Sequence, residues 1–161
     1  MKEIFTIVLS LVSLLGAGQQ VISVDSILID TYKVTNSKEI IQTSGAKILI
    51  SSGPKVINQL VKQFSDSTRT NVYSDCQNRF LRKGDIAVII ADHIEPMPYT
   101  RLTGIQNCLF KFCENNPNRI EYYLYAITEN RFVDFQSAYL SWLNSNERKQ
   151  LYTTKRKKGR K

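Results

Sequence analysis

The sequence is poor in the residues that build metal sites and disulfide scaffolds: its 161 residues include one histidine and three cysteines. Four prolines and seven glycines exclude a collagen-like or low-complexity chain. No Gly-rich phosphate loop, GxSxG motif or zinc-ribbon spacing is present. We therefore expect no metal, no cofactor and no catalytic residue set. Apolar residues make up 42% of the chain, which is enough for the core of one domain.

The first eighteen residues have the pattern of a secretory signal peptide. The uncharged run Ile4–Leu15 is followed by Gly16 and Gly18, which suit the −3 and −1 positions of a cleavage site. As a helix this run would be about 18 Å long, which is short of the ~30 Å hydrocarbon core of a membrane. We expect residues 1–18 to be removed, which leaves no transmembrane anchor. The alternatives are a buried helix of the domain and an uncleaved anchor.

The positive charge is concentrated at the other end of the chain. Taking the six basic residues of the last seven from the 22 Lys and Arg leaves 16, against 14 Asp and Glu. The body is therefore close to neutral, and residues 153–161 are predicted to form a disordered basic tail. An anionic envelope or polysaccharide is one expected partner of the tail, and a solvated end without a partner is the alternative. Nucleic acid is not expected after export. The basic residues are Lys155, Arg156, Lys157, Lys158, Arg160 and Lys161.

Residues 19–152 are predicted to form a single, mainly α domain with a minor β component. We expect a compact bundle of about five or six helices and one N-terminal β-hairpin near residues 39–51. The hairpin is indicated by two apolar runs on either side of Ser44 and Gly45, since glycine suits a tight turn.

Apolar residues at helical spacing predict the helices. Helices are expected to begin at Pro54, Gly104 and Asn118, a shorter one covers Asn71–Leu81, and the last ends near Gln150. The segment Ile86–Glu95, capped by Asp85, is apolar almost all round and is the expected central helix. The residues expected to face inward elsewhere are Val56, Ile57, Leu60, Val61, Phe64, Val72, Cys76, Phe80, Ile105, Cys108, Leu109, Phe112, Ile120, Tyr123, Leu124, Ile127, Phe132, Phe135, Tyr139 and Trp142.

The three cysteines suggest one disulfide in an exported protein. Cys76 and Cys108 both fall on predicted core faces and are the expected pair. Cys108 and Cys113 are five residues apart, which on one helix separates them by about 140°, so a bond between them is disfavoured. Free buried thiols are the alternative.

A polar group at the end of the predicted central helix is the second candidate site. Asp92 and Glu95 share a helix edge, His93 lies between them, and Arg101 follows at the start of the next helix. These residues form a candidate polar site. A structural role at the end of a buried helix is the preferred interpretation, because a single histidine is weak support for a metal.

These observations lead to three functional hypotheses. The first is an exported, non-enzymatic binding protein of bacterial type, periplasmic or extracellular, whose partner is another protein, as in inhibitor or immunity modules. The second is a protein that associates with anionic envelope or polysaccharide through its basic tail. The third is a small hydrolase using Asp92, His93 and Glu95.

Overall fold

A computed structural model describes residues 23–105, 113, 115–128 and 132–150. The predicted signal segment and basic tail lie outside the described residues. The elements in chain order are α1 (Val24–Ile27), the 3-10 helices η1 (Thr31–Lys33) and η2 (Ser37–Gln42), α2 (Ser44–Ser52), η3 (Gly53–Val56), α3 (Ile57–Val61), the strands β1 (Arg69–Ser74) and β2 (Arg79–Arg82), α4 (Lys83–Ile94), α5 (Tyr99–Thr103), η4 (Arg119–Tyr123), α6 (Leu124–Thr128) and α7 (Phe132–Leu143).

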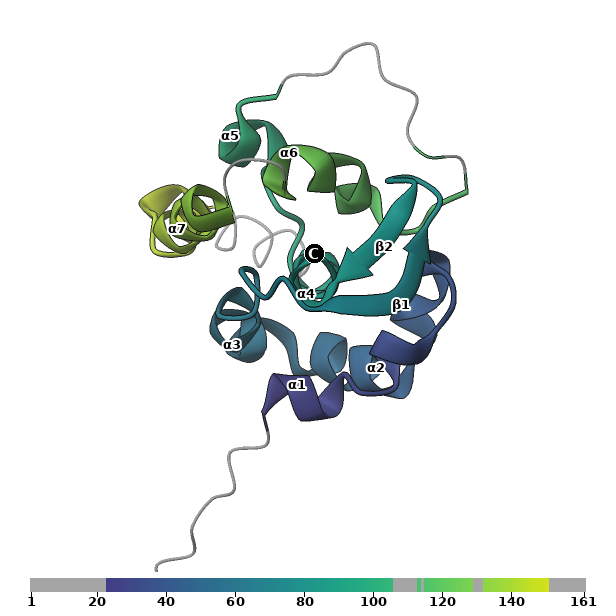
Figure 1. The fold of residues 1–161 in the computed structure, drawn as a ribbon. Helices are drawn as coiled ribbons and strands as arrows, with labels where there is room; N and C mark the ends of the chain where they lie inside the picture. The colour runs from purple at the N-terminus through teal and green to yellow at the C-terminus, as the bar shows by residue number, and fades with distance from the viewer. Residues whose placement is uncertain (1–22, 106–112, 114, 129–131, 151–161) are drawn as a thin grey trace, which may run out of the picture.

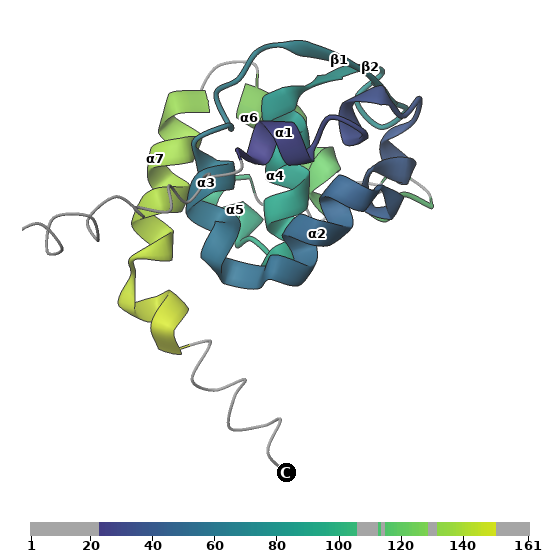
Figure 2. The ribbon, with the colours of Figure 1, turned by 90° about the horizontal axis from the view of Figure 1, so that it is seen from below.

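Helix α4 lies at the centre of the fold in two perpendicular views (Figures 1 and 2). Its residues from Ile86 to Ala91 are fully buried, and the helix contacts α2, α3, β2 and η4. The prediction of a central buried helix is confirmed. Asp85 is the third residue of the helix rather than its cap: it accepts the backbone N–H of Arg82 at 2.8 Å and the guanidinium of Arg79 at 2.7 Å.

Within the described residues the fold is mainly helical with one two-stranded antiparallel sheet, as expected, but the hairpin is in a different place. Strands β1 and β2 occupy residues 69–82, where a helix was predicted over 71–81. Thr70, Val72 and Ser74 are buried and alternate with side chains that face outward, which is the period of a strand. Asn78 ends the turn with a φ of 50°, a left-handed conformation that asparagine tolerates.

The hairpin predicted near residues 39–51 is wrong, because this segment forms η2 and α2. Thr43 caps α2: its Oγ1 accepts the backbone N–H of Ala46 at 3.3 Å. Gly45 lies inside the helix rather than in a turn. A Cβ at Gly45 would collide with the carbonyl oxygen of Ile27 and crowd Asp30, so the glycine allows α2 to pack closely on the end of α1.

Helix α7 packs through its aromatic residues, as predicted. The ring of Tyr139 stacks with Phe64 of the segment after α3 at 5.6 Å and with Trp142 at 5.5 Å. The helix ends at Leu143, and helical structure resumes over residues 146–150. Gly104, where a helix was expected to begin, instead ends α5 with a φ of 70°. Most of the helix expected after it lies outside the described residues.

Candidate functional site

Asp92 fixes the turn between α4 and α5. Its Oδ1 accepts the backbone N–H of Met97 at 2.8 Å, and its Oδ2 accepts the hydroxyl of Tyr99 at 3.2 Å. Burial raises the pKa of the Asp92 carboxyl, and these two hydrogen bonds offset the rise only in part. Burial and the nearby Asp92 together raise the pKa of the Tyr99 phenol. Both oxygens of Asp92 are therefore engaged in holding the chain after α4.

Glu95 and Arg101 connect the end of α4 and α5 to the chain after α7. Arg148 forms a two-pronged ion pair with the buried Glu95, with Nε at 2.7 Å from Oε1 and Nη2 at 2.8 Å from Oε2. Arg101 forms an ion pair with Glu147, and both of these side chains are exposed. The two pairs thus join residues 147 and 148 to α5 and to the end of α4.

His93 binds a part of the chain that neither Asp92 nor Glu95 contacts. Its Nε2 lies 2.9 Å from Oδ1 of Asn118, in the loop before η4. The structure therefore places Asp92, His93 and Glu95 at one end of α4, but each engages a different segment. In the described part of the chain, no group of three or more His, Cys, Asp or Glu side chains is arranged to hold a metal ion.

A second polar group, which the sequence did not indicate, surrounds Glu121 of η4. We call Ser37, Ser74, Asn116, Asn118 and Glu121 the Glu121 cluster. The fully buried carboxylate accepts hydrogen bonds from the hydroxyls of Ser37, at 2.7 Å, and Ser74. It also accepts from the amides of Asn116 at 2.8 Å and Asn118 at 3.3 Å. A carboxylate has about four acceptor positions, so this one is saturated by groups that hold the fold together.

The disulfide joins Cys76, in the turn of the hairpin, to Cys113, with the Cα atoms 5.4 Å apart. The expected pairing of Cys76 with Cys108 is therefore wrong in its second partner, and Cys108 lies outside the described residues. Ser74 at the end of β1 and Asn116 both bind the Glu121 carboxylate, so the same cluster brings residue 113 beside the turn. Gln77 adds a hydrogen bond from its side chain to the Glu121 carbonyl at 2.6 Å.

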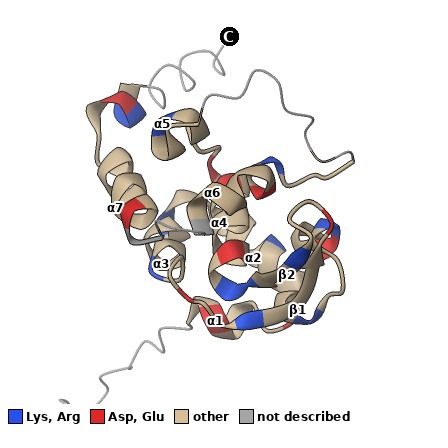
Figure 3. Cartoon of the chain, turned by 45° about the horizontal axis from the view of Figure 1, so that its top comes forward, with Lys and Arg blue, Asp and Glu red and all other residues tan. Residues whose placement is uncertain are grey.

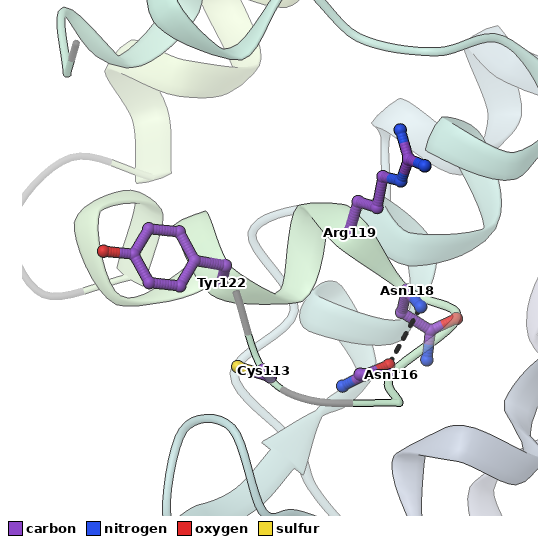
Figure 4. A pocket seen from close by; sticks show the side chains of 5 residues that line it. All are labelled: Cys113, Asn116, Asn118, Arg119 and Tyr122. Carbon is purple, nitrogen blue, oxygen red and sulfur yellow. Dashed lines mark hydrogen bonds between the residues drawn. The ribbon is translucent and has the colours of Figure 1, made fainter. Parts of the chain in front are cut away.

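A small pocket lies next to this disulfide (Figure 4). Its interior space of about 20 Å³ holds little more than one water molecule. Within it, the Asn116 side chain accepts the backbone N–H of Asn118 at 2.9 Å. The lining residues are Cys113, Asn116, Asn118, Arg119 and Tyr122.

The outward side of the hairpin carries a different kind of surface. We call the outward-facing side chains of β1 and β2 the hairpin face. Phe80 is 38% exposed, and the guanidinium carbon of Arg69 lies 4.3 Å from the centre of its ring. The ring of Tyr73 meets Phe80 edge to face at 5.4 Å. Both strands carry basic residues (Figure 3), all of which are arginine. The hairpin face consists of Arg69, Asn71, Tyr73, Phe80 and Arg82.

No helix in the described residues is both long enough and apolar enough to cross a membrane. Comparison of the chain with protein-family models, with curated proteins and with solved structures finds no match. The arrangement of the described residues is therefore the basis for a functional proposal.

Proposed function

We propose that the protein is an exported, non-enzymatic binding protein and that its contact surface is the hairpin face. The observation that carries the proposal is the composition of this face. Aromatic residues and arginine are the side chains enriched at protein binding surfaces. Here two aromatic rings and two arginines share one side of a two-stranded sheet, and Phe80 remains 38% exposed despite its contacts.

The arrangement of the buried polar groups supports binding rather than catalysis. Asp92, His93 and Glu95 each bind a different structural partner, and the carboxylate of Glu121 is saturated by four donors. The pocket beside the disulfide has room for about one water molecule. The hydrolase hypothesis therefore has the least support of the three.

Export is supported by two independent features. The first is the signal-like pattern of residues 1–18. The second is the Cys76–Cys113 disulfide, since disulfides form and persist mainly in oxidising compartments outside the cytosol.

The proposal is tested by crosslinking the full chain in the cells that produce it and measuring the size of the crosslinked species. We expect a larger complex with the natural sequence and its loss in Phe80→Ala. Ile48→Ala is the matched control, because Ile48 is 54% exposed but lies on α2, outside the hairpin face. A complex that is equally abundant in Phe80→Ala and the natural sequence would rule out this face as the contact surface.

A second candidate function rests on the basic tail, in which six of the last seven residues are Lys or Arg. Near an anionic membrane each such residue contributes on the order of 1 kcal/mol. A chain without residues 155–161 is expected to move from the envelope fraction to the soluble fraction, whereas unchanged fractionation would remove this role from the tail.

A further inference from the structure

We propose that the ion pair between Arg79 and Asp85 closes the free edge of β2, so that this strand does not pair with a strand of a second copy of the chain. An open strand edge presents unpaired backbone groups, which pair readily with another chain. In the described residues the sheet has only two strands, so each strand has one edge that the other leaves uncovered. The inference goes beyond the proposed function and does not depend on the partner of the hairpin face.

The outer edge of β1 is covered by the segment before η2. The backbone N–H of Tyr73 donates to the carbonyl oxygen of Thr35 at 3.0 Å, and Asn36 forms a parallel bridge with Tyr73. This segment lies beside β1 in the place of a third strand. The edge that remains for another chain is therefore that of β2.

The hydrogen bonds to the β1 side show which backbone groups of β2 point away from it. The carbonyl oxygen of Leu81 accepts the hydroxyl of Thr70 at 2.8 Å, and the backbone N–H of Lys83 donates to the carbonyl oxygen of Thr68 at 2.9 Å. Along an antiparallel strand, successive residues direct their backbone groups to opposite edges. The residues that alternate with these, beginning with Phe80, therefore face the free edge.

The ion pair holds one backbone group of each outward-facing residue. The carbonyl oxygen of Phe80 accepts Nη1 of Arg79 at 3.2 Å. The backbone N–H of Arg82 donates to Oδ2 of Asp85 at 2.8 Å. The guanidinium and the carboxylate also bind each other, with Nη1 at 2.7 Å from Oδ2 and Nη2 at 3.3 Å from Oδ1. A strand that approached this edge would find one acceptor and one donor already engaged.

The helix that follows β2 engages a third group. Arg82 is the N-cap of α4, so its carbonyl oxygen accepts a hydrogen bond from the helix. Figure 1 shows β2 running directly into α4. Three of the four backbone groups on the free edge are thus engaged within the chain.

The burial of the pair makes this closure durable. The side chain of Asp85 is fully buried, and that of Arg79 is 27% exposed. Separating a buried carboxylate from its cation is strongly unfavourable, so an arriving strand would gain few hydrogen bonds and would have to break this contact. Charged side chains at an edge are a common means by which proteins prevent strand pairing.

The test measures the mass of the full, oxidised chain in solution by size-exclusion chromatography with light scattering, at low and high concentration. We expect the natural sequence to stay monomeric. Arg79→Met keeps a long side chain but removes the ion pair and the bond to Phe80. At high concentration its average mass should rise by about twofold or more, and infrared spectra should show the amide I band of intermolecular strands.

A second variant and a control separate this effect from loss of stability. Arg79→Met/Asp85→Asn leaves no buried charge without a partner and keeps an oxygen for the N–H of Arg82, and it should associate as well. Lys83→Met removes the cation that binds Asp25 at 2.7 Å but touches no group of the free edge, and it should stay monomeric. Circular dichroism and urea unfolding establish that each variant is folded.

Three results would overturn the inference. The first is a natural sequence that itself forms intermolecular strands. The second is a folded Arg79→Met/Asp85→Asn that stays monomeric at high concentration. The third is equal association of Lys83→Met, which would mean that the loss of any ion pair in this region causes it.

Discussion

Two carboxyl groups, of Glu121 and Asp92, are buried in this fold in different ways. Glu121 accepts hydrogen bonds from four side chains, which replace the water that a free carboxylate would bind. Asp92 accepts two, and burial raises the pKa of its carboxyl. At Glu121 the four hydrogen bonds compensate for the loss of water on burial. At Asp92 burial destabilises the ionised form of the carboxyl group.

Asp92 should therefore reduce the stability of the fold as the pH rises. Because its pKa is higher in the folded chain than the ordinary value of 3.8, the folded state binds the proton more tightly. As the pH rises from the pKa of Asp92 in the unfolded chain to its pKa in the folded chain, the protein loses stability. It does not regain this stability at higher pH. Asp92→Asn cannot ionise and keeps an oxygen for the N–H of Met97. In urea unfolding from about pH 4 to pH 7, the free energy of unfolding of Asp92→Asn should rise relative to that of the natural sequence.

The control is Asp134→Asn, which alters an exposed carboxyl on α7. The effect of pH on Asp134→Asn gives the baseline against which the effect on Asp92→Asn is compared. A natural sequence that gains stability relative to Asp92→Asn as the pH rises would contradict the assignment.

At the scale of helices and strands, the sequence predicts the position of the most apolar helix correctly. The residues from Ile86 to Ala91 are apolar on every side, and α4 is the central helix. The hairpin formed by β1 and β2 is not predicted, because Val72, Cys76 and Phe80 fit a helical face as well as they fit two strands joined by a turn. At Gly45 the sequence predicts a hairpin turn, but the residue lies in a helix. Its missing side chain allows a close contact with α1.

Gly84 gives a prediction of the same kind for the start of α4. Glycine within a helix usually costs about 1 kcal/mol relative to alanine, so an alanine would ordinarily stabilise the helix. Here a Cβ would collide with the carbonyl oxygen of Phe64 and lie 3.0 Å from that of Asp66. Gly84→Ala should instead lower the free energy of unfolding by about 1–3 kcal/mol, as measured by urea denaturation.

Ser141→Ala, on the exposed side of α7, serves as the comparison and should change stability by less than about 0.5 kcal/mol. A gain of stability in Gly84→Ala would mean that α4 and the chain after α3 can separate without cost.

At the scale of the whole molecule, only one of the two buried polar groups could be predicted from the sequence. Asp92, His93 and Glu95 are adjacent in the sequence, so their common position at the end of α4 is a local property. The Glu121 cluster joins residues as far as 84 positions apart, through the hydrogen bond from Ser37. No local pattern marks such a cluster, and the same long-range docking decides that Cys113 is the partner of Cys76.

The disulfide should make a large contribution to stability. A loop of 37 residues closed by one bond corresponds to about 4 kcal/mol in the chain-entropy model. Reduction of the natural sequence should lower the free energy of unfolding by about this amount, and Cys76→Ala/Cys113→Ala should be similarly unstable with or without reductant. Urea denaturation with and without dithiothreitol measures both effects.

The variant Cys108→Ala distinguishes a bond between Cys76 and Cys113 from one between Cys76 and Cys108. It should keep the full response to reductant if Cys76 is joined to Cys113. Loss of that response in Cys108→Ala would restore the pairing of Cys76 with Cys108.

The same bond encloses α4 and α5 within a covalent ring that runs from residue 76 to residue 113. A single cut of the backbone anywhere inside this ring leaves one molecule rather than two, because the pieces stay joined through sulfur. A nicked chain would migrate as an intact one on a non-reducing gel and separate into two fragments after reduction. For a protein proposed to be exported, the ring keeps the central helix attached to the rest of the chain after such a cut.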